Sequence, residues 1–205
     1  WHILHDQDPT VYQGEAEDFF AEMSAKYAKY DNVIYEICNE PNGGATWDGS
    51  VKPYAETIIP IIRKNDKDAI IIVGTPTWSQ DVDAAADNPI TGQANIMYAI
   101  HFYAATHTDG IRSKVSYALD KGLPVFVSEF SICDASGNGS NDYDQAAKWF
   151  DLIDENQLSY CSWSLSNKAE TSALISSGCS KTSGWSEDDL SETGKWIRDQ
   201  ILGKH

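Results

Sequence analysis

Short apolar runs recur along the chain and alternate with longer stretches of helical periodicity. The runs are residues 32–38, 69–74, 94–103, 123–130 and 158–165, with a shorter one over 1–4. Apolar runs without polar alternation are typical of strands that are covered on both faces, as in a parallel sheet. The pattern therefore predicts five parallel strands and a sixth, a strand stub at the beginning of the chain.

The stretches between these runs predict helices over residues 14–30, 50–66, 109–122, 140–157 and 186–202. In the second of these helices, Pro53 falls near the first turn, where proline is tolerated, and Pro60 predicts a kink. Gly122 is placed to end the third helix, and Ser186 to cap the last one. Strands that alternate with helices in this way are the repeating units of α/β folds.

Polar and aromatic residues gather where the predicted strands end. They are Asn39 and Glu40, Thr75 and Trp78, His101 and Tyr103, Glu129, and Trp163. A (β/α)8 barrel builds its active site at this end of its strands. An open doubly wound sheet also binds ligands there, but the chain has no glycine-rich phosphate turn after its first strand. We therefore predict a partial (β/α)8 TIM barrel with about six of the eight strands, as one truncated catalytic domain over residues 1–205.

The net charge of −16 and the pI near 4.5 narrow the range of partners. An acidic surface repels phosphate backbones and anionic membranes, so we expect neither nucleic acid nor a membrane as a partner. No apolar stretch reaches the roughly 18 residues that a membrane span needs. A neutral substrate fits this surface, although the acidity is explained equally well by the solubility of a secreted protein.

Cysteines and acidic loops do not predict a metal or a cofactor. Cys38, Cys133 and Cys161 lie in or just after strand patterns and are interpreted as small core residues. The loop 133–144 is rich in oxygen ligands but lacks the spacing of a calcium-binding loop, and we expect it to shape one side of the cleft. His5 and His107 are interpreted as surface residues.

Two carboxylates at separate strand ends suggest the cleavage of a glycosidic bond. In this chemistry one carboxylic acid protonates the leaving oxygen, and a carboxylate roughly 5 Å away attacks the anomeric carbon in a retaining enzyme. Glu40 and Glu129 are the candidates, on the fourth and seventh strands of a full barrel. A surface position is the usual fate of a single glutamate. That interpretation weakens when His101, Tyr103 and Trp163 follow neighbouring strands.

An ordered set of motifs resembles the endoglucanases of glycoside hydrolase family 5, and most closely their bacterial cellulase branch. The motifs are "NEP" at 39–41, "HFY" at 101–103, "SEF" at 128–130 and "WSLSNKAE" at 163–170, while "WHILHDQDP" at 1–9 resembles the end of the third strand of that family. "NEP" alone is a weak signal, but the ordered set is specific. The resemblance covers essentially the whole chain.

The resemblance implies a division of labour at the catalytic centre. Glu40 corresponds to the general acid/base and Glu129 to the nucleophile. His101 and Tyr103 resemble the pair that steadies the acid and the nucleophile, respectively. Asn39 resembles the residue that binds the 2-hydroxyl of the sugar in the −1 subsite.

The resemblance also implies a set of sugar-binding residues. His2 would line the −1 subsite and Trp163 would lie under the −1 sugar. Lys168, Glu170 and Ala135 would contact the −2 sugar, and Trp78 would stack on the plus side. The flat apolar faces of both tryptophans suit the C–H faces of glucose, with an ordinary core position as the alternative for each of them.

The implied function is that of a secreted, retaining endo-β-1,4-glucanase acting on cellulose, carboxymethylcellulose or mixed-linkage glucan. Xyloglucan and mannan stay open as substrates. The first two strands of the family, one of which carries an arginine that binds the nucleophile, have no counterpart here. The alternative is therefore an inactive or weakly carbohydrate-binding half-barrel. We expect a homo-oligomer, or a complementary N-terminal fragment, to cover the gap in the barrel.

Overall fold

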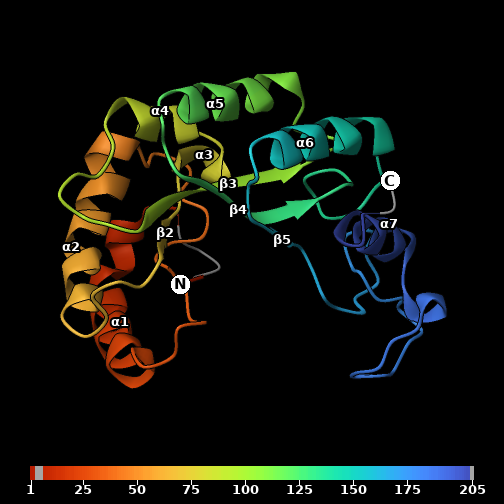
Figure 1. The fold of residues 1–205 in the computed structure, drawn as a ribbon, viewed down its shortest axis with the longest axis horizontal. Helices are drawn as coiled ribbons and strands as arrows, with labels where there is room; N and C mark the ends of the chain where they lie inside the picture. Colours follow the sequence, from red (N-terminus) through yellow and green to blue (C-terminus); the bar gives the residue numbers. More distant parts are fainter. Residues whose placement is uncertain (3–6, 204–205) are drawn as a thin grey trace. The chain divides into compact units, whose positions relative to one another are not determined.

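The computed structural model describes residues 1–2 and 7–203, and its strands form one parallel sheet with the order β1-β2-β3-β4-β5 (Figure 1). The strands are β1 (Tyr35–Glu36), β2 (Ile71–Val73), β3 (Ile96–Tyr103), β4 (Val125–Ser131) and β5 (Tyr160–Ser162). Parallel ladders join β1 to β2, β2 to β3, and β4 to β5. The five predicted strands and their parallel arrangement are confirmed. The sixth is not: Trp1 and His2 belong to no strand, and Ile3 and Leu4 lie outside the described residues.

All five predicted helices are present. They are α1 (Gln13–Tyr27), α2 (Lys52–Arg63), α5 (Asp109–Asp120), α6 (Tyr143–Glu155) and α7 (Glu192–Ile201). Pro53 lies in the first turn of α2, which continues from a π-helical turn, η2 (Trp47–Val51), and Pro60 lies inside α2. Beyond α5, Gly122 has φ of +79° and donates its amide hydrogen to the carbonyl of Leu119, which ends the helix as predicted.

Four short elements were not predicted from the sequence. They are η1 (Pro9–Tyr12), α3 (Pro76–Ser79), α4 (Val82–Asp87) and η3 (Glu187–Asp189). The last of them corrects a boundary. Ser186 caps η3 through a reciprocal box with Asp189, whereas α7 begins later and is capped by Ser191, whose hydroxyl accepts from the amide of Gly194.

The chain forms two compact units, and β3 and β4 pass from one to the other. Unit 1 consists of the residues up to 100 together with 113–126, and unit 2 of residues 101–112 together with those from 127 onward. In unit 1, α1 packs against α2. The buried face of α2 supplies the apolar residues Tyr54, Ala55, Ile58, Ile59 and Ile62.

An aromatic cluster forms the core of unit 2. The rings of Phe102 and Trp149 stack with centroids 3.9 Å apart and an interplanar angle of 4°. Phe150 meets Phe130 and Trp196 edge-on at 5.6 and 5.1 Å. Such stacked and edge-on pairs add stabilisation beyond the area that they bury, so β3 and β4 are firmly packed against α6 within this unit.

The cysteine prediction is confirmed in part. Cys38 and Cys133 are buried, whereas Cys161 is exposed, so its interpretation as a core residue was wrong. Cys161 lies on β5, the last strand in the sheet order, where the side chains are at most half-buried. Among the described residues, no helix is long and apolar enough to cross a membrane.

Candidate active site

The segment after β1 carries Asn39 and Glu40 in unit 1, and both residues are half-buried. The end of β2 approaches this segment closely, since a Cβ added to Gly74 would lie 2.4 Å from the carbonyl oxygen of Cys38. Only glycine fits there without a shift of the backbone. The carbonyl of Glu40 accepts a hydrogen bond of 3.0 Å from the side-chain amide of Asn42. The backbone that carries Glu40 is therefore anchored by its neighbours in the chain.

Glu129 lies on β4 in unit 2, is 9% exposed, and accepts a 2.7 Å hydrogen bond at Oε1 from the phenol of Tyr103. A donor of this kind favours the ionised form of a carboxylate. His101 and Tyr103 are two positions apart on β3 and so face the same side of the strand. The structure thus brings Tyr103 and Glu129 together from adjacent strands.

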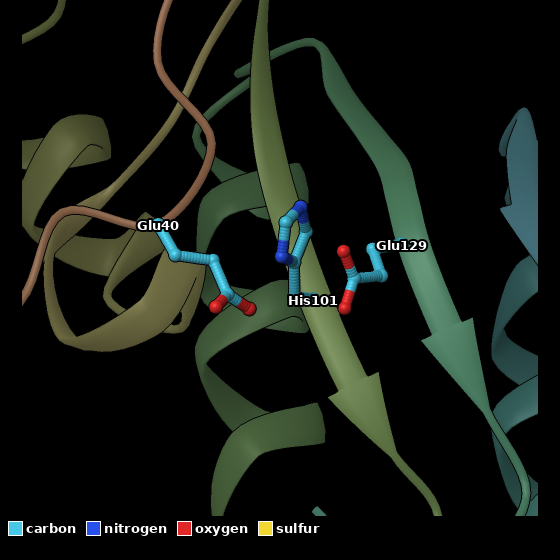
Figure 2. A group of neighbouring side chains, drawn as sticks. All are labelled: Glu40, His101 and Glu129. Atoms are coloured by element: carbon cyan, nitrogen blue, oxygen red, sulfur yellow. The ribbon is translucent and has the colours of Figure 1, made fainter. Parts of the chain in front are cut away.

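His101 is almost fully buried, and its Nε2 lies 2.9 Å from the hydroxyl of Ser128. Figure 2 draws His101 on β3, Glu129 on β4, and Glu40 on the loop after β1. The nearest ligand atoms of His101 and Glu129 lie within 4.8 Å of each other.

The residues expected around the −2 sugar also lie in unit 2. Lys168 and Glu170 form an ion pair of 2.7 Å, in which the lysine is largely exposed and the glutamate largely buried. Both line a hollow of about 460 Å³ that also includes Asn138 and Thr171. Ala135 is exposed, and its amide donates to the hydroxyl of Thr106 at 2.9 Å.

Two side chains of the loop 133–144 accept hydrogen bonds, one from within the loop and one from outside it. The carboxylate of Asp134 accepts from the amide of Ser136 at 2.8 Å and from its hydroxyl, which hold the pKa of this carboxyl below its usual range against the opposing effect of burial. The side-chain oxygen of Asn138 accepts from the amide of Thr171 at 3.3 Å. These oxygens therefore brace the loop.

Both candidate stacking residues expose their indole rings. Trp163, in unit 2, is 39% exposed, and its amide donates to the carbonyl of Phe130 at 2.8 Å. Trp78, in unit 1, is 49% exposed, so its alternative interpretation as a core aromatic was wrong. His2 is exposed, while the amino group of Trp1 donates to the carbonyl of Glu36 at 2.5 Å.

Sequence reasoning missed three polar residues of this region. Ser128 contacts His101, and Ser79 bonds to the backbone beside Glu40. His107 is half-buried and accepts the amide hydrogen of Tyr103 at Nδ1 over 2.8 Å, so its interpretation as a surface residue was wrong. His5 lies outside the described residues. Ser128 and Ser79 are adjacent to the candidate residues Glu129 and Trp78, and His107 lies four positions after Tyr103, but such proximity along the chain does not reveal a tertiary contact.

Comparisons with known proteins agree on one family. Residues 1–169 match the family model described as cellulase, glycosyl hydrolase family 5. The chain is 51% identical over 205 residues to an endoglucanase of Clostridium saccharobutylicum and 52% identical over 202 residues to endoglucanase A of Evansella cellulosilytica. It covers 46% and 41% of those proteins, so it spans less than half of the length of each.

Solved structures are similar as well. The catalytic domain of a Thermobifida fusca endoglucanase matches with a TM-score of 0.92 and 38% identity, over 98% of this chain and 68% of that domain. The same domain in complex with cellotetraose matches with a TM-score of 0.90 and 37% identity, over 98% of this chain and 68% of that one. Together with the alternating strands and helices, these matches confirm the predicted fold class, a partial (β/α)8 barrel.

Proposed function

Since the chain belongs to the cellulase family, glycosyl hydrolase family 5, we propose that it carries the catalytic carboxylates of a retaining endo-β-1,4-glucanase. The observation that supports this proposal best is the 2.7 Å bond from Tyr103 to Glu129 at the carboxyl end of β4. A buried carboxylate next to a fixed donor suits a nucleophile, which has to attack in its ionised form. The carboxyl ends of parallel strands are where barrel enzymes gather their catalytic groups.

Glu40 is the proposed acid/base of this reaction. It follows the carboxyl end of β1, and Glu129 lies near the carboxyl end of β4, another parallel strand. Glu40 protonates the glycosidic oxygen while an oxygen of Glu129 attacks the anomeric carbon and forms a glycosyl ester. Ionised Glu40 then removes a proton from water, which displaces Glu129. Two inversions at one carbon retain the β configuration.

The proposed substrate is a β-1,4-glucan chain bound across both sides of this pair. Four residues act at the −1 sugar: Asn39, His101, Trp163 and His2. The −2 sugar contacts Lys168, Glu170 and Ala135. Trp78 stacks on the plus side. Exposed indoles provide apolar platforms of the right size for sugar rings. Residues 1–205 are proposed to act as one catalytic domain, in a protein that functions outside the cell, where cellulose is found.

A reducing-sugar assay on carboxymethylcellulose, with Glu129→Gln as its control, tests the activity. We expect turnover in the wild type and none in the variant. A chain that binds cello-oligosaccharides but gives no turnover would establish the alternative, a carbohydrate-binding half-barrel. A panel that adds mixed-linkage glucan, xyloglucan and mannan ranks the substrates.

The stereochemistry provides an independent test. NMR during hydrolysis should detect the β-anomer first, and an α-anomer would refute the assignment of Glu129 as the nucleophile. An experimental structure should place the two carboxyl groups roughly 5 Å apart, and a separation beyond roughly 9 Å would contradict a retaining mechanism.

We also propose that the free edges of the sheet are covered in solution, by a second copy of the chain or by a complementary N-terminal fragment. On β5, the last strand in the sheet order, Cys161 is exposed and its two neighbours are only half-buried. Leaving apolar surface in water costs about 25 cal/mol per Å². Light scattering on the 205-residue chain should therefore show a dimer or a larger oligomer. A monomer that melts cooperatively at micromolar concentration would refute self-association.

A further inference from the structure

Three consecutive residues of the turn after β2 adopt a left-handed backbone. Within α3, Thr77, Trp78 and Ser79 have φ of 56°, 56° and 55°. None is glycine, and side chains other than those of glycine, asparagine and aspartate disfavour this region. Backbone of this kind persists where the surrounding structure holds it, and it concentrates at functional sites.

The contacts that hold this turn end on both sides of Glu40. The amide of Trp78 donates to the carbonyl of Pro41 at 2.9 Å, and the hydroxyl of Ser79 donates to the carbonyl of Asn39 at 2.7 Å. The side-chain amide of Asn42 donates to the carbonyl of Glu40 itself, so the three successive carbonyls at 39, 40 and 41 all accept a hydrogen bond. Two of these donors come from the left-handed turn.

Ser79 is suited to fix the peptide that precedes Glu40. It is fully buried, and its oxygen also accepts a 3.2 Å hydrogen bond from the amide of Thr75. This incoming bond leaves the hydroxyl proton directed at the carbonyl of Asn39, so the hydroxyl bridges the end of β2 to the Asn39–Glu40 peptide. A side-chain hydroxyl makes both bonds because it is a donor and an acceptor at once.

We propose that Ser79 is a positioning residue for Glu40, and that the left-handed turn ties the exposed indole of Trp78 to the backbone that carries this carboxylate. The inference builds on the proposed function and extends it. The leaving sugar, stacked on Trp78, and the acid that protonates its oxygen are held by one rigid segment. Ser79 therefore acts on the protonation of the leaving group rather than on nucleophilic attack.

Two variants at one position separate the hydroxyl from the backbone strain. Ser79→Ala removes the hydroxyl and keeps the strained φ, whereas Ser79→Gly removes the hydroxyl and relaxes the strain, because glycine adopts positive φ readily. Thr77→Gly relaxes the same turn and leaves the bonds to Asn39 and Pro41 in place. On cellotetraose we expect both Ser79 variants to lose about ten- to a hundredfold in kcat with little change in KM, and Thr77→Gly to keep the wild-type rate.

An activated leaving group distinguishes positioning of the acid from a merely structural role. A dinitrophenyl β-cellobioside needs little protonation, so Ser79→Ala should keep its rate on this substrate within about threefold. Equal losses on both substrates would refute the proposal, and so would wild-type rates on both. A wild-type rate of Ser79→Gly on cellotetraose would assign the effect to strain and also refute it.

The assay uses the preparation in which the wild type shows turnover, either the chain alone or the chain with a complementary N-terminal fragment. Absence of turnover in both preparations would refute the proposed function. The positioning inference would then be tested by NMR. In that case the amide resonance of Glu40, which reports on the peptide bonded by Ser79, should shift in Ser79→Ala and Ser79→Gly but not in Thr77→Gly. An unchanged resonance in both Ser79 variants would overturn the inference.

Discussion

The two units position their candidate catalytic carboxylates by different means. In unit 1 the backbone around Glu40 is fixed, since the carbonyls at 39, 40 and 41 are all bonded by neighbouring segments. In unit 2 the side chain of Glu129 is fixed, by the phenol of Tyr103 on the adjacent strand. In unit 1 the contacts act on the peptides around the carboxylate residue, and in unit 2 the contact acts on a carboxylate oxygen.

This difference matches what the two proposed roles demand. An acid/base has to gain and lose a proton in each turnover, and a fixed backbone keeps the residue in one place while it does so. A nucleophile has to stay ionised and aimed at one carbon, which a fixed donor supports. The comparison predicts that variants in the two units will affect different steps of the reaction.

Removal of each carboxylate should produce the largest difference in kcat between variants of the two units. Glu129→Ala should lower kcat by about 10⁴-fold or more on every substrate, because no other group forms the glycosyl ester. Glu40→Ala should lower kcat by about 10²- to 10⁴-fold on carboxymethylcellulose but much less on a dinitrophenyl β-cellobioside. The measurement is steady-state kinetics on both substrates. Equal losses for Glu40→Ala on the two substrates would contradict the division of labour.

The loss of the phenol donor should have the next largest effect. Tyr103→Phe removes the 2.7 Å bond to Glu129 and should lower kcat by about 10- to 100-fold, since a hydrogen bond to a charged group contributes about 1.5–3 kcal/mol. The rate on an activated aryl cellobioside should fall as well, because nucleophilic attack is the affected step.

Tyr98→Phe is the matched control in unit 1. Tyr98 is buried as well, and its hydroxyl accepts from the amide of Ile90 at 2.8 Å. This variant should lose stability, by about 1 kcal/mol, but retain kcat. A similar fall in kcat for both variants would show that the buried phenols act through general stability.

The strands and main helices could be predicted because their causes are local. Apolar runs such as the one that contains β2 (Ile71–Val73) can be recognised as buried strands, and the α2 sequence presents one apolar face at helical spacing. The strand expected over residues 1–4 and the start of the last helix, which was assigned to Ser186, were harder to predict. A serine followed by Glu187, Asp188 and Asp189 satisfies the capping pattern in any short turn, and only the structure shows that Ser191 begins the longer helix.

The supporting residues of the site could not be predicted, because their causes are tertiary. The left-handed turn at Thr77–Ser79 contradicts the intrinsic preference of its residues and is stabilised by carbonyls nearly forty positions earlier in the chain. His107 was unpredictable for a similar reason, since its acceptor role depends on the turn that brings it back to Tyr103. Glu40 and Glu129 could be found because residue type and strand-end position alone identify them.

Acid pH should weaken unit 2 through Asp189. The ammonium of Lys181 at 2.6 Å, followed by the amide and hydroxyl of Ser186, holds the pKa of this carboxyl well below its usual value. A depressed pKa in the folded state stabilises the protein above the ordinary value of 3.8 and stops doing so as the pH falls through the folded value.

Asp189→Asn should therefore lower Tm near neutral pH, and the gap to wild type should narrow as the pH drops below about 4. Asp188→Asn makes the same change of charge one residue away and serves as the control. Thermal melts between pH 7 and pH 2.5 measure both gaps. A gap for Asp189→Asn that does not change with pH would show that its ionisation is not linked to folding.

Alkaline pH should weaken unit 1 through Tyr35, and this is the smallest of the expected effects. Burial, and after it the neighbouring carboxylate of Asp66, which accepts from the phenol at 3.3 Å, raises the pKa of Tyr35 to about 12. The neutral phenol is thus favoured in the folded state. Its contribution is complete below the ordinary value of 10.0 and is lost as the pH rises toward 12.

Tyr35→Phe should lower Tm at pH 8 by about 2–4 °C, the equivalent of one hydrogen bond of about 1 kcal/mol. Because phenylalanine cannot ionise, the variant should approach or overtake the wild type between pH 10 and pH 12. Denaturant unfolding at pH 8, 10 and 12 measures the difference, with Tyr98→Phe as a second buried phenol for which burial also raises the pKa. A constant difference between Tyr35→Phe and wild type over this range would show that the phenol of Tyr35 titrates alike in the folded and unfolded chains.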